Sequence, residues 1–200
     1  MSKSLPSRPS LEQLKTQAKE LLKALQAGEP TALNRFSENH PQGAHVGTFA
    51  RDASWSLSDA QLVIAREYGA ASWPNRREHV AAKLVATGDP MDLLRQAFTE
   101  DDATLFRQLL ERHPALKARI DEPVEAFNSP VITQVRSREM LDVLLDAGAK
   151  IDVRSKWWAG GFGLLDTAEP GLAHYAIERG AKVDVHAAAR LGMLGKLREL

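Results

Sequence analysis

Two short segments of this chain repeat one another at a fixed distance. The segment LLDAGAKIDV begins at Leu144 and the segment AIERGAKVDV begins at Ala176, so that Gly148 and Gly180 are 32 residues apart. In each copy the glycine follows a run with helical spacing, at a point where the helix must end in a left-handed residue, and glycine adopts this conformation without a steric penalty. A repeat of this length predicts stacked units that bury their apolar faces against their neighbours.

The elements of these units are expected to be helices. The chain contains 29 Ala and 26 Leu but 11 Val and 5 Ile, a balance that favours helix over strand. From Leu11 to Leu25, leucine and alanine recur at spacings of three and four residues, with Ser10 as a candidate cap before the run and Gly28 after it. Residues 41–56 have no clear period and are interpreted as a loop. The sequence therefore predicts an all-α fold.

A fainter repeat lies upstream. The segments TALNRFSENHP (Thr31–Pro41) and TLFRQLLERHP (Thr104–Pro114) share a threonine, the apolar spacing, a glutamate and a His-Pro ending, with an offset of 73 residues. Between them, Gly88-Asp89-Pro90 interrupts the helical pattern. We therefore expect an N-terminal helical region over residues 1–88 and degenerate repeats over residues 89–200.

Several segments are similar to those of a known family. HAAARLGMLGKLREL, after Gly180, resembles the ankyrin helix–turn–helix, and SPVITQV resembles a degenerate TPLHxA segment. The chain resembles bacterial ankyrin-repeat proteins. Its period is close to the ankyrin repeat length, and three further segments are similar to segments of these proteins: LEQLKTQAKELLKALQAGEPTAL, DAQLVIAREYGAASWP and WWAGGFGLLD. The resemblance implies an ankyrin-like helical solenoid and a non-enzymatic scaffold that binds a protein partner. The chain departs from the family because TPLH is nowhere intact and Val153–Phe162 replaces the usual polar finger.

The segment that replaces this finger is the predicted binding site. Two of the four tryptophans are adjacent in it, and neighbouring side chains of an extended backbone point to opposite sides, so at least one ring is expected to be exposed. Exposed aromatic side chains flanked by Arg and Lys have the composition of interface hot spots, and glycines allow a ligand to approach the backbone. The predicted binding residues are Arg154, Lys156, Trp157, Trp158, Gly160, Gly161, Phe162 and Asp166.

Other interpretations stay open. In one, the tryptophans pack onto neighbouring repeats and the glycines make turns. In another, the loop borders an enclosed pocket for a small molecule or substrate, with Asp166 or His174 as an acid or base; an open apolar patch with a polar rim favours the scaffold instead. The sequence stops at Leu200 inside a helical pattern without a polar capping repeat. Either the sequence is truncated there or the C-terminal face is open, and in a third interpretation this open face makes a homodimer.

Charge and cysteine usage exclude several functional classes. Lys and Arg number 26, as do Asp and Glu, which excludes nucleic-acid binding through bulk positive charge. The absence of cysteine excludes a disulfide framework and a cysteine nucleophile. His40, His45 and Asp52 match no metal-ligand spacing, and no phosphate-loop motif follows the glycines, so no metal or cofactor is expected. Without a long apolar run or a secretory signal, we expect no membrane contact and a cytoplasmic location.

Overall fold

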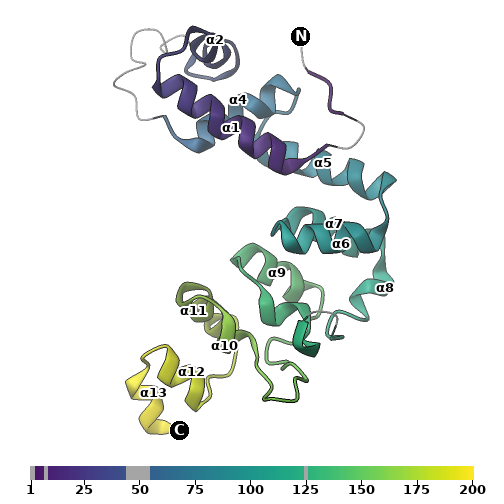
Figure 1. Cartoon of the computed structure of the whole chain (residues 1–200), viewed down its shortest axis with the longest axis vertical. Coiled ribbons are helices and arrows are strands. Elements are labelled where there is room, and N and C mark those ends of the chain that lie inside the picture. Colours follow the sequence, from purple (N-terminus) through teal and green to yellow (C-terminus); the bar gives the residue numbers. More distant parts are fainter. Residues whose placement is uncertain (1–2, 7–8, 44–54, 124–125) are drawn as a thin grey trace. The chain divides into compact units, whose positions relative to one another are not determined.

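The described part of the chain is helical. The computed structural model describes residues 3–6, 9–43, 55–123 and 126–200, and within these ranges it contains helices and no strand, which confirms the all-α prediction. Of the loop expected at residues 41–56, residues 44–54 lie outside the described ranges. The chain divides into two compact units, residues 1–89 and 90–200, whose helices are labelled in Figure 1.

The first unit is built around one long amphipathic helix. Helix α1 packs along α4 and against α2, and α5 packs against α4. The side chains that α1 buries recur at spacings of three and four residues, as the sequence predicts for one face of a helix. The helices are α1 (Leu11–Gln26), α2 (Pro30–Asn39), α4 (Leu57–Glu67) and α5 (Trp73–Thr87).

Local capping explains where these helices begin and end. The Ser10 hydroxyl accepts a hydrogen bond from the Gln13 backbone N–H before α1, as expected from the sequence, and Gly28 adopts a left-handed φ of 75° after it. Before α4, Ser56 and Asp59 form a reciprocal capping box. These side chains satisfy backbone donors that the first turn of a helix leaves unpaired.

The second unit consists of consecutive helix pairs. In chain order the pairs are α6 with α7, η3 with α9, α10 with α11, and α12 with α13. The second helices of these pairs pack in a row, α7 against α9 and α9 against α11. The first elements of the later pairs also pack in a row, η3 against α10 and α10 against α12. Helices α7, α9, α10 and α11 therefore bury apolar residues against neighbours along the chain. The elements are α6 (Pro90–Thr99), α7 (Ala103–Arg112), α8 (Pro114–Lys117), η2 (Ala126–Asn128), η3 (Val131–Gln134), α9 (Arg138–Asp146), α10 (Leu164–Thr167), α11 (Pro170–Glu178), α12 (Val185–Arg190) and α13 (Leu194–Glu199).

The two repeated glycines adopt the same conformation. Gly148 follows α9 with a φ of 97°, and Gly180 follows α11 with a φ of 103°. In both copies the next residue donates a backbone hydrogen bond back into the helix, Ala149 to Leu144 and Ala181 to Ala176, each at 2.9 Å. The left-handed helix ends expected from the sequence are confirmed.

Aspartates link the turns that follow successive helix pairs. Asp121 accepts a hydrogen bond from the Lys150 backbone N–H at 3.0 Å, and Asp152 accepts one from the Lys182 backbone N–H at 2.9 Å. The segment Arg119-Ile120-Asp121 is thus an earlier copy of Lys150-Ile151-Asp152 and Lys182-Val183-Asp184. No glycine precedes this copy, so the sequence pattern alone does not reveal it.

Candidate functional site

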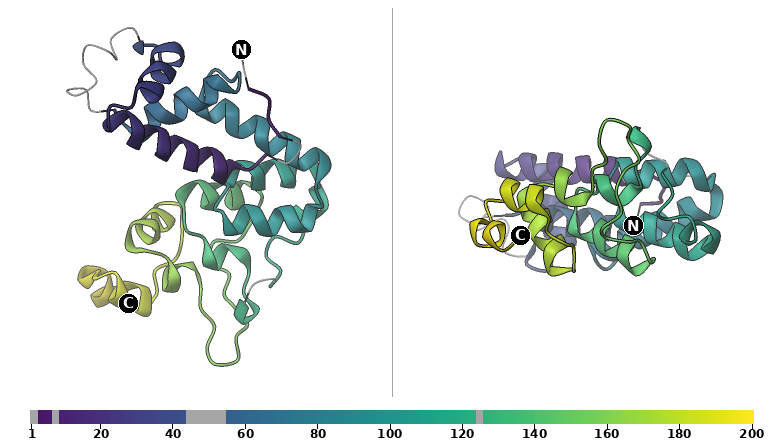
Figure 2. Two further views of the ribbon diagram at one scale, coloured as in Figure 1. Left: turned by 45° about the horizontal axis from the view of Figure 1, so that its top comes forward. Right: turned by 90° about the horizontal axis from the view of Figure 1, so that it is seen from below.

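The segment that contains Trp157 and Trp158 forms a loop closed by hydrogen bonds between Ser155 and Phe162. The Ser155 backbone N–H donates to the Phe162 carbonyl oxygen at 2.7 Å, and the Phe162 N–H donates to the Ser155 hydroxyl at 3.0 Å. The Ser155 side chain is buried by this arrangement. Figure 2 shows the segment as a loop that projects from the helices of its unit. The closure at Ser155 and Phe162 places Trp157 and Trp158 in the projecting part.

Arg154 and Asp166, both predicted to bind a ligand, hold the base of this loop. The Arg154 guanidinium donates to the Gly161 carbonyl oxygen at 2.7 Å and to the Asp166 carboxylate at 2.9 Å, and it lies 3.5 Å from the Asp184 carboxylate. Asp166 also accepts the Gly163 backbone N–H at 2.8 Å at the start of α10. These two side chains are therefore engaged within the protein, whereas the Lys156 side chain is exposed beside the tryptophans.

The glycines of the loop have conformational and steric roles. Gly160 has a φ of 125°, a conformation that residues with a side chain rarely adopt. A Cβ on Gly161 would lie 2.6 Å from the Ser155 carbonyl oxygen. At these two positions glycine permits the tight path of the loop itself.

Replacing Gly161 with alanine should open the loop. The new Cβ would overlap the Ser155 carbonyl oxygen, whose peptide group also carries the Lys156 N–H that donates to the Asn128 carbonyl oxygen. Such overpacking costs about 1–3 kcal/mol. We expect a lower free energy of unfolding in urea and faster hydrogen exchange at the Lys156 amide. The matched control is Gly171→Ala in α11, where a Cβ meets nothing within 4 Å; equal stability losses in the two variants would contradict the steric argument.

Three aromatic rings of the loop and its closing residue form a cluster with one ring from an earlier segment. We define this aromatic cluster as the rings of Phe127, Trp157, Trp158 and Phe162. Phe127 makes edge-to-face contacts with Trp157 and Phe162 at centroid distances of 5.2 and 6.2 Å, and Trp157 contacts Trp158 at 6.3 Å. Trp158 is 92% exposed, Phe127 57% and Trp157 37%. The expectation that adjacent tryptophans leave at least one ring exposed is confirmed.

Phe127 is the member of the cluster that the sequence does not predict. It lies in an acidic, irregular segment, thirty residues from Trp157, and no local pattern marks it. Its φ is 61° and that of Asn128 is 56°, and the left-handed region is common for asparagine but unfavourable for a bulky residue. The Asn128 carbonyl oxygen accepts the Lys156 backbone N–H at 2.9 Å, which ties this strained turn to the loop. Backbone strain of this kind is frequent at functional sites.

A small polar hollow adjoins the base of the loop. Its volume is about 170 Å³, below the roughly 300–1,000 Å³ of typical small-molecule pockets. His174, the candidate acid or base, is not among its lining residues, and its Nδ1 is bonded to the Pro170 carbonyl oxygen at 2.7 Å on the exposed face of α11. The charged residues that line the hollow are Asp152, Arg154, Asp166, Lys182 and Asp184.

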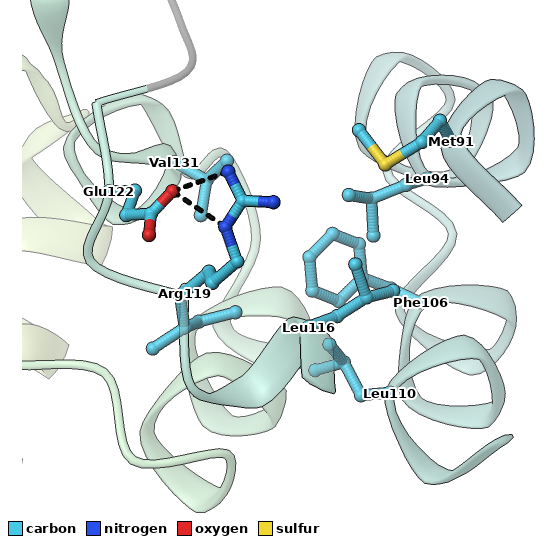
Figure 3. Close-up of a pocket in the computed structure, with 9 residues that line it drawn as sticks. Met91, Leu94, Phe106, Leu110, Leu116, Arg119, Glu122 and Val131 are labelled. Carbon is cyan, nitrogen blue, oxygen red and sulfur yellow. Dashed lines mark hydrogen bonds and ion pairs between the residues drawn. The ribbon is translucent and has the colours of Figure 1, made fainter. Parts of the chain in front are cut away.

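A second hollow in this unit is apolar and smaller. Figure 3 shows Met91, Leu94, Phe106 and Leu110 on one side and the Arg119–Glu122 ion pair on the other. The hollow holds about 70 Å³, and apart from the Arg119–Glu122 ion pair its lining is apolar. It has room for one small apolar group and carries no evident chemistry.

The described residues show neither a metal-ligand group nor a membrane-spanning helix. Within these ranges no cluster of His, Asp and Glu is arranged to hold a metal ion, and none of the helices found there has the length and apolarity needed to cross a bilayer. His45 and Asp52, considered above as ligands, lie outside the described residues. At the C-terminal end, Val185, Leu194 and Leu200 are exposed, and the interpretation of this end as a homodimer interface stays open.

Comparison with known proteins identifies no relative of this chain. No family model matches the chain, no curated protein matches it, and no solved structure matches it.

Proposed function

We propose that this chain is a non-enzymatic scaffold of the ankyrin-repeat type that binds a protein partner through the aromatic cluster. The observation that carries the proposal is the set of exposed rings on a loop braced from both ends. Aromatic residues supply much of the energy at protein interfaces. Because the hydrogen bonds of Ser155 and Arg154 already fix the loop, binding would cost little conformational entropy.

The arrangement of the second unit supports the ankyrin-like part of the proposal. Its helix pairs pack in rows, its repeated glycines end corresponding helices, and its aspartates link successive turns. Units that contact their sequence neighbours in this way characterise helical solenoids. We also propose a cytoplasmic location, on the sequence grounds given above.

Within this proposal the predicted binding residues take different roles. Trp157, Trp158 and Phe162, together with Phe127, are the apolar anchors, and Lys156 is the orienting charge at the rim. Arg154, Asp166, Gly160 and Gly161 shape the loop that carries these side chains. The alternative of a small-molecule or catalytic pocket beside the loop is not favoured, because the adjoining hollow is small and the Arg154–Asp166 ion pair occupies its edge.

Paired capture from a lysate of the host tests the proposal. The baits are the wild-type chain, the Trp157→Ala/Trp158→Ala variant and a Leu194→Ala control, which removes an exposed apolar side chain of α13 outside the cluster. We expect a protein that the wild type and the control retain and the tryptophan variant loses. With that protein purified, the dissociation constant should rise at least about 30-fold in the tryptophan variant, the size of a hot-spot loss.

Circular dichroism must show the same helix content in all three baits. If the tryptophan variant is folded and captures the same proteins with the same affinity, or if no bait captures a specific protein, the aromatic cluster is not a protein-binding site.

A further inference from the structure

The first unit contains a separate, larger hollow between α1 and α2. Its volume is about 480 Å³, within the range of small-molecule pockets. Buried Leu21 and Ala32 contribute apolar surface, and the small side chains of Ala24 and Ala32 leave the helices room to form it. The polar residues that line the hollow are Lys3, Gln17, Glu20, Glu29, Thr31, Arg35 and Tyr68.

One part of this hollow is cationic. Lys3 Nζ lies 2.7 Å and Arg35 Nε lies 2.6 Å from the Glu67 carboxylate, whose side chain is 7% exposed. Lys3 also lies over the Tyr68 ring, and the Tyr68 hydroxyl donates to Gln17 at 3.4 Å. Two cations share one buried carboxylate, so this cluster retains one net positive charge toward the hollow.

Another part of the hollow is acidic. Glu29 is the N-cap residue of α2, its side chain caps no backbone N–H, and it is exposed. Arg35 lies six residues further along the same helix, and both side chains line the hollow. Glu20 on α1 adds a second exposed carboxylate. The hollow thus presents opposite charges at two points of one helix.

The N-terminal segment completes the cationic part. The Lys3 backbone N–H donates to the Glu67 carbonyl oxygen at 2.7 Å, and Lys83 Nζ donates to the Pro6 carbonyl oxygen at 2.8 Å. These bonds hold residues 3–6 against the unit from two sides. The position of Lys3 in the lining is therefore fixed by the fold and is not that of a loose terminus.

We propose that this hollow binds a small zwitterion of dipeptide length, with its carboxylate at Lys3 and Arg35 and its ammonium group at Glu29. A dipeptide fits within the volume of about 480 Å³, and its two termini carry the opposite charges that complement Glu29 on one hand and Lys3 and Arg35 on the other. A ligand with one charge leaves part of the hollow without a counter-charge, and Glu20 and Glu29 repel a purely anionic one. The site lies outside the aromatic cluster and does not rest on the scaffold proposal.

Calorimetric titration of the full chain with alanyl-alanine tests the site. The comparison probes are N-acetyl-alanyl-alanine, which keeps the carboxylate alone, alanyl-alanine amide, which keeps the ammonium group alone, and free alanine, which is too short. We expect alanyl-alanine to bind at least about tenfold more tightly than each comparison probe, since each loses a charge-assisted contact.

Two variants connect the binding to the hollow. Glu29→Gln should weaken alanyl-alanine binding about tenfold, whereas Glu38→Gln, an exposed glutamate of α2 outside the lining, should leave it unchanged. Tyr68 ring signals in NMR spectra should shift with alanyl-alanine. The proposal is overturned if alanyl-alanine does not bind up to about 10 mM, if a single-charge probe binds equally well, or if Glu29→Gln and Glu38→Gln behave alike.

Discussion

Replacing Phe36 with alanine is expected to lower the free energy of unfolding of the first unit by about 3–5 kcal/mol. Phe36 lies on α2 and is completely buried. Its ring stacks near His40 at a centroid distance of 5.9 Å and meets Trp55 edge-on at 5.3 Å, and His40 and Trp55 contact each other at 5.0 Å. Removing the ring leaves a cavity whose lining loses both dispersion contacts and aromatic packing.

Urea denaturation followed by circular dichroism measures this loss, and hydrogen exchange of α1, α2 and α4 localises it. The matched control is Phe127→Ala, which deletes the same atoms from a ring that is 57% exposed and should cost less than about 1 kcal/mol. A Phe36→Ala variant no less stable than Phe127→Ala would mean that this contact does not hold the first unit together.

Replacing Glu67 with glutamine should lower stability at pH 7 by about 1.5–3 kcal/mol, the contribution of hydrogen bonds to charged groups. Burial raises the pKa of Glu67, but hydrogen bonds and charge from Arg35 and Lys3 outweigh it, and the net pKa lies below its ordinary value of 4.5. A carboxyl group with a lowered folded-state pKa stabilises the protein above its unfolded pKa. That contribution is lost as the pH falls below 4.5 through the folded-state pKa.

The difference in unfolding free energy between wild type and Glu67→Gln should therefore be constant above pH 5.5 or so and shrink in more acidic solution. Glu122→Gln is the control. Hydrogen bonding by Arg119 also lowers the pKa of Glu122, but both side chains of this pair are exposed, and exposed ion pairs contribute little. A difference for Glu67→Gln that did not vary with pH would contradict the assigned role of its charge.

Local signals allowed the helices to be predicted. Ser10 before α1, Gly28 after it, and Gly148 and Gly180 after α9 and α11 act on backbone groups within three to five residues, so their consequences can be inferred from adjacent letters. The periodic leucines of α1 likewise predict which face is buried.

The candidate site was predicted in part for the same reason. Adjacency alone implies that Trp157 and Trp158 do not both point inward, and Trp158 is indeed the most exposed ring of the cluster. The observed role of Arg154, which braces the base of the loop, could not be predicted because it depends on the partners of its guanidinium. Asp166 and Asp184 lie 12 and 30 residues away in the sequence, and their positions around the guanidinium follow from the packing of α10 and α12.

By itself, the sequence determined the helices, the left-handed glycines that end them and an exposed tryptophan loop, because these depend on backbone conformation and side-chain spacing over a few residues. Only the tertiary structure brought Phe127 to Trp157, joined Asp121 to Lys150, and buried Glu67 between Lys3 and Arg35. Those contacts join residues about thirty or more positions apart, and they form where the packing of several apolar helix faces happens to bring the side chains together.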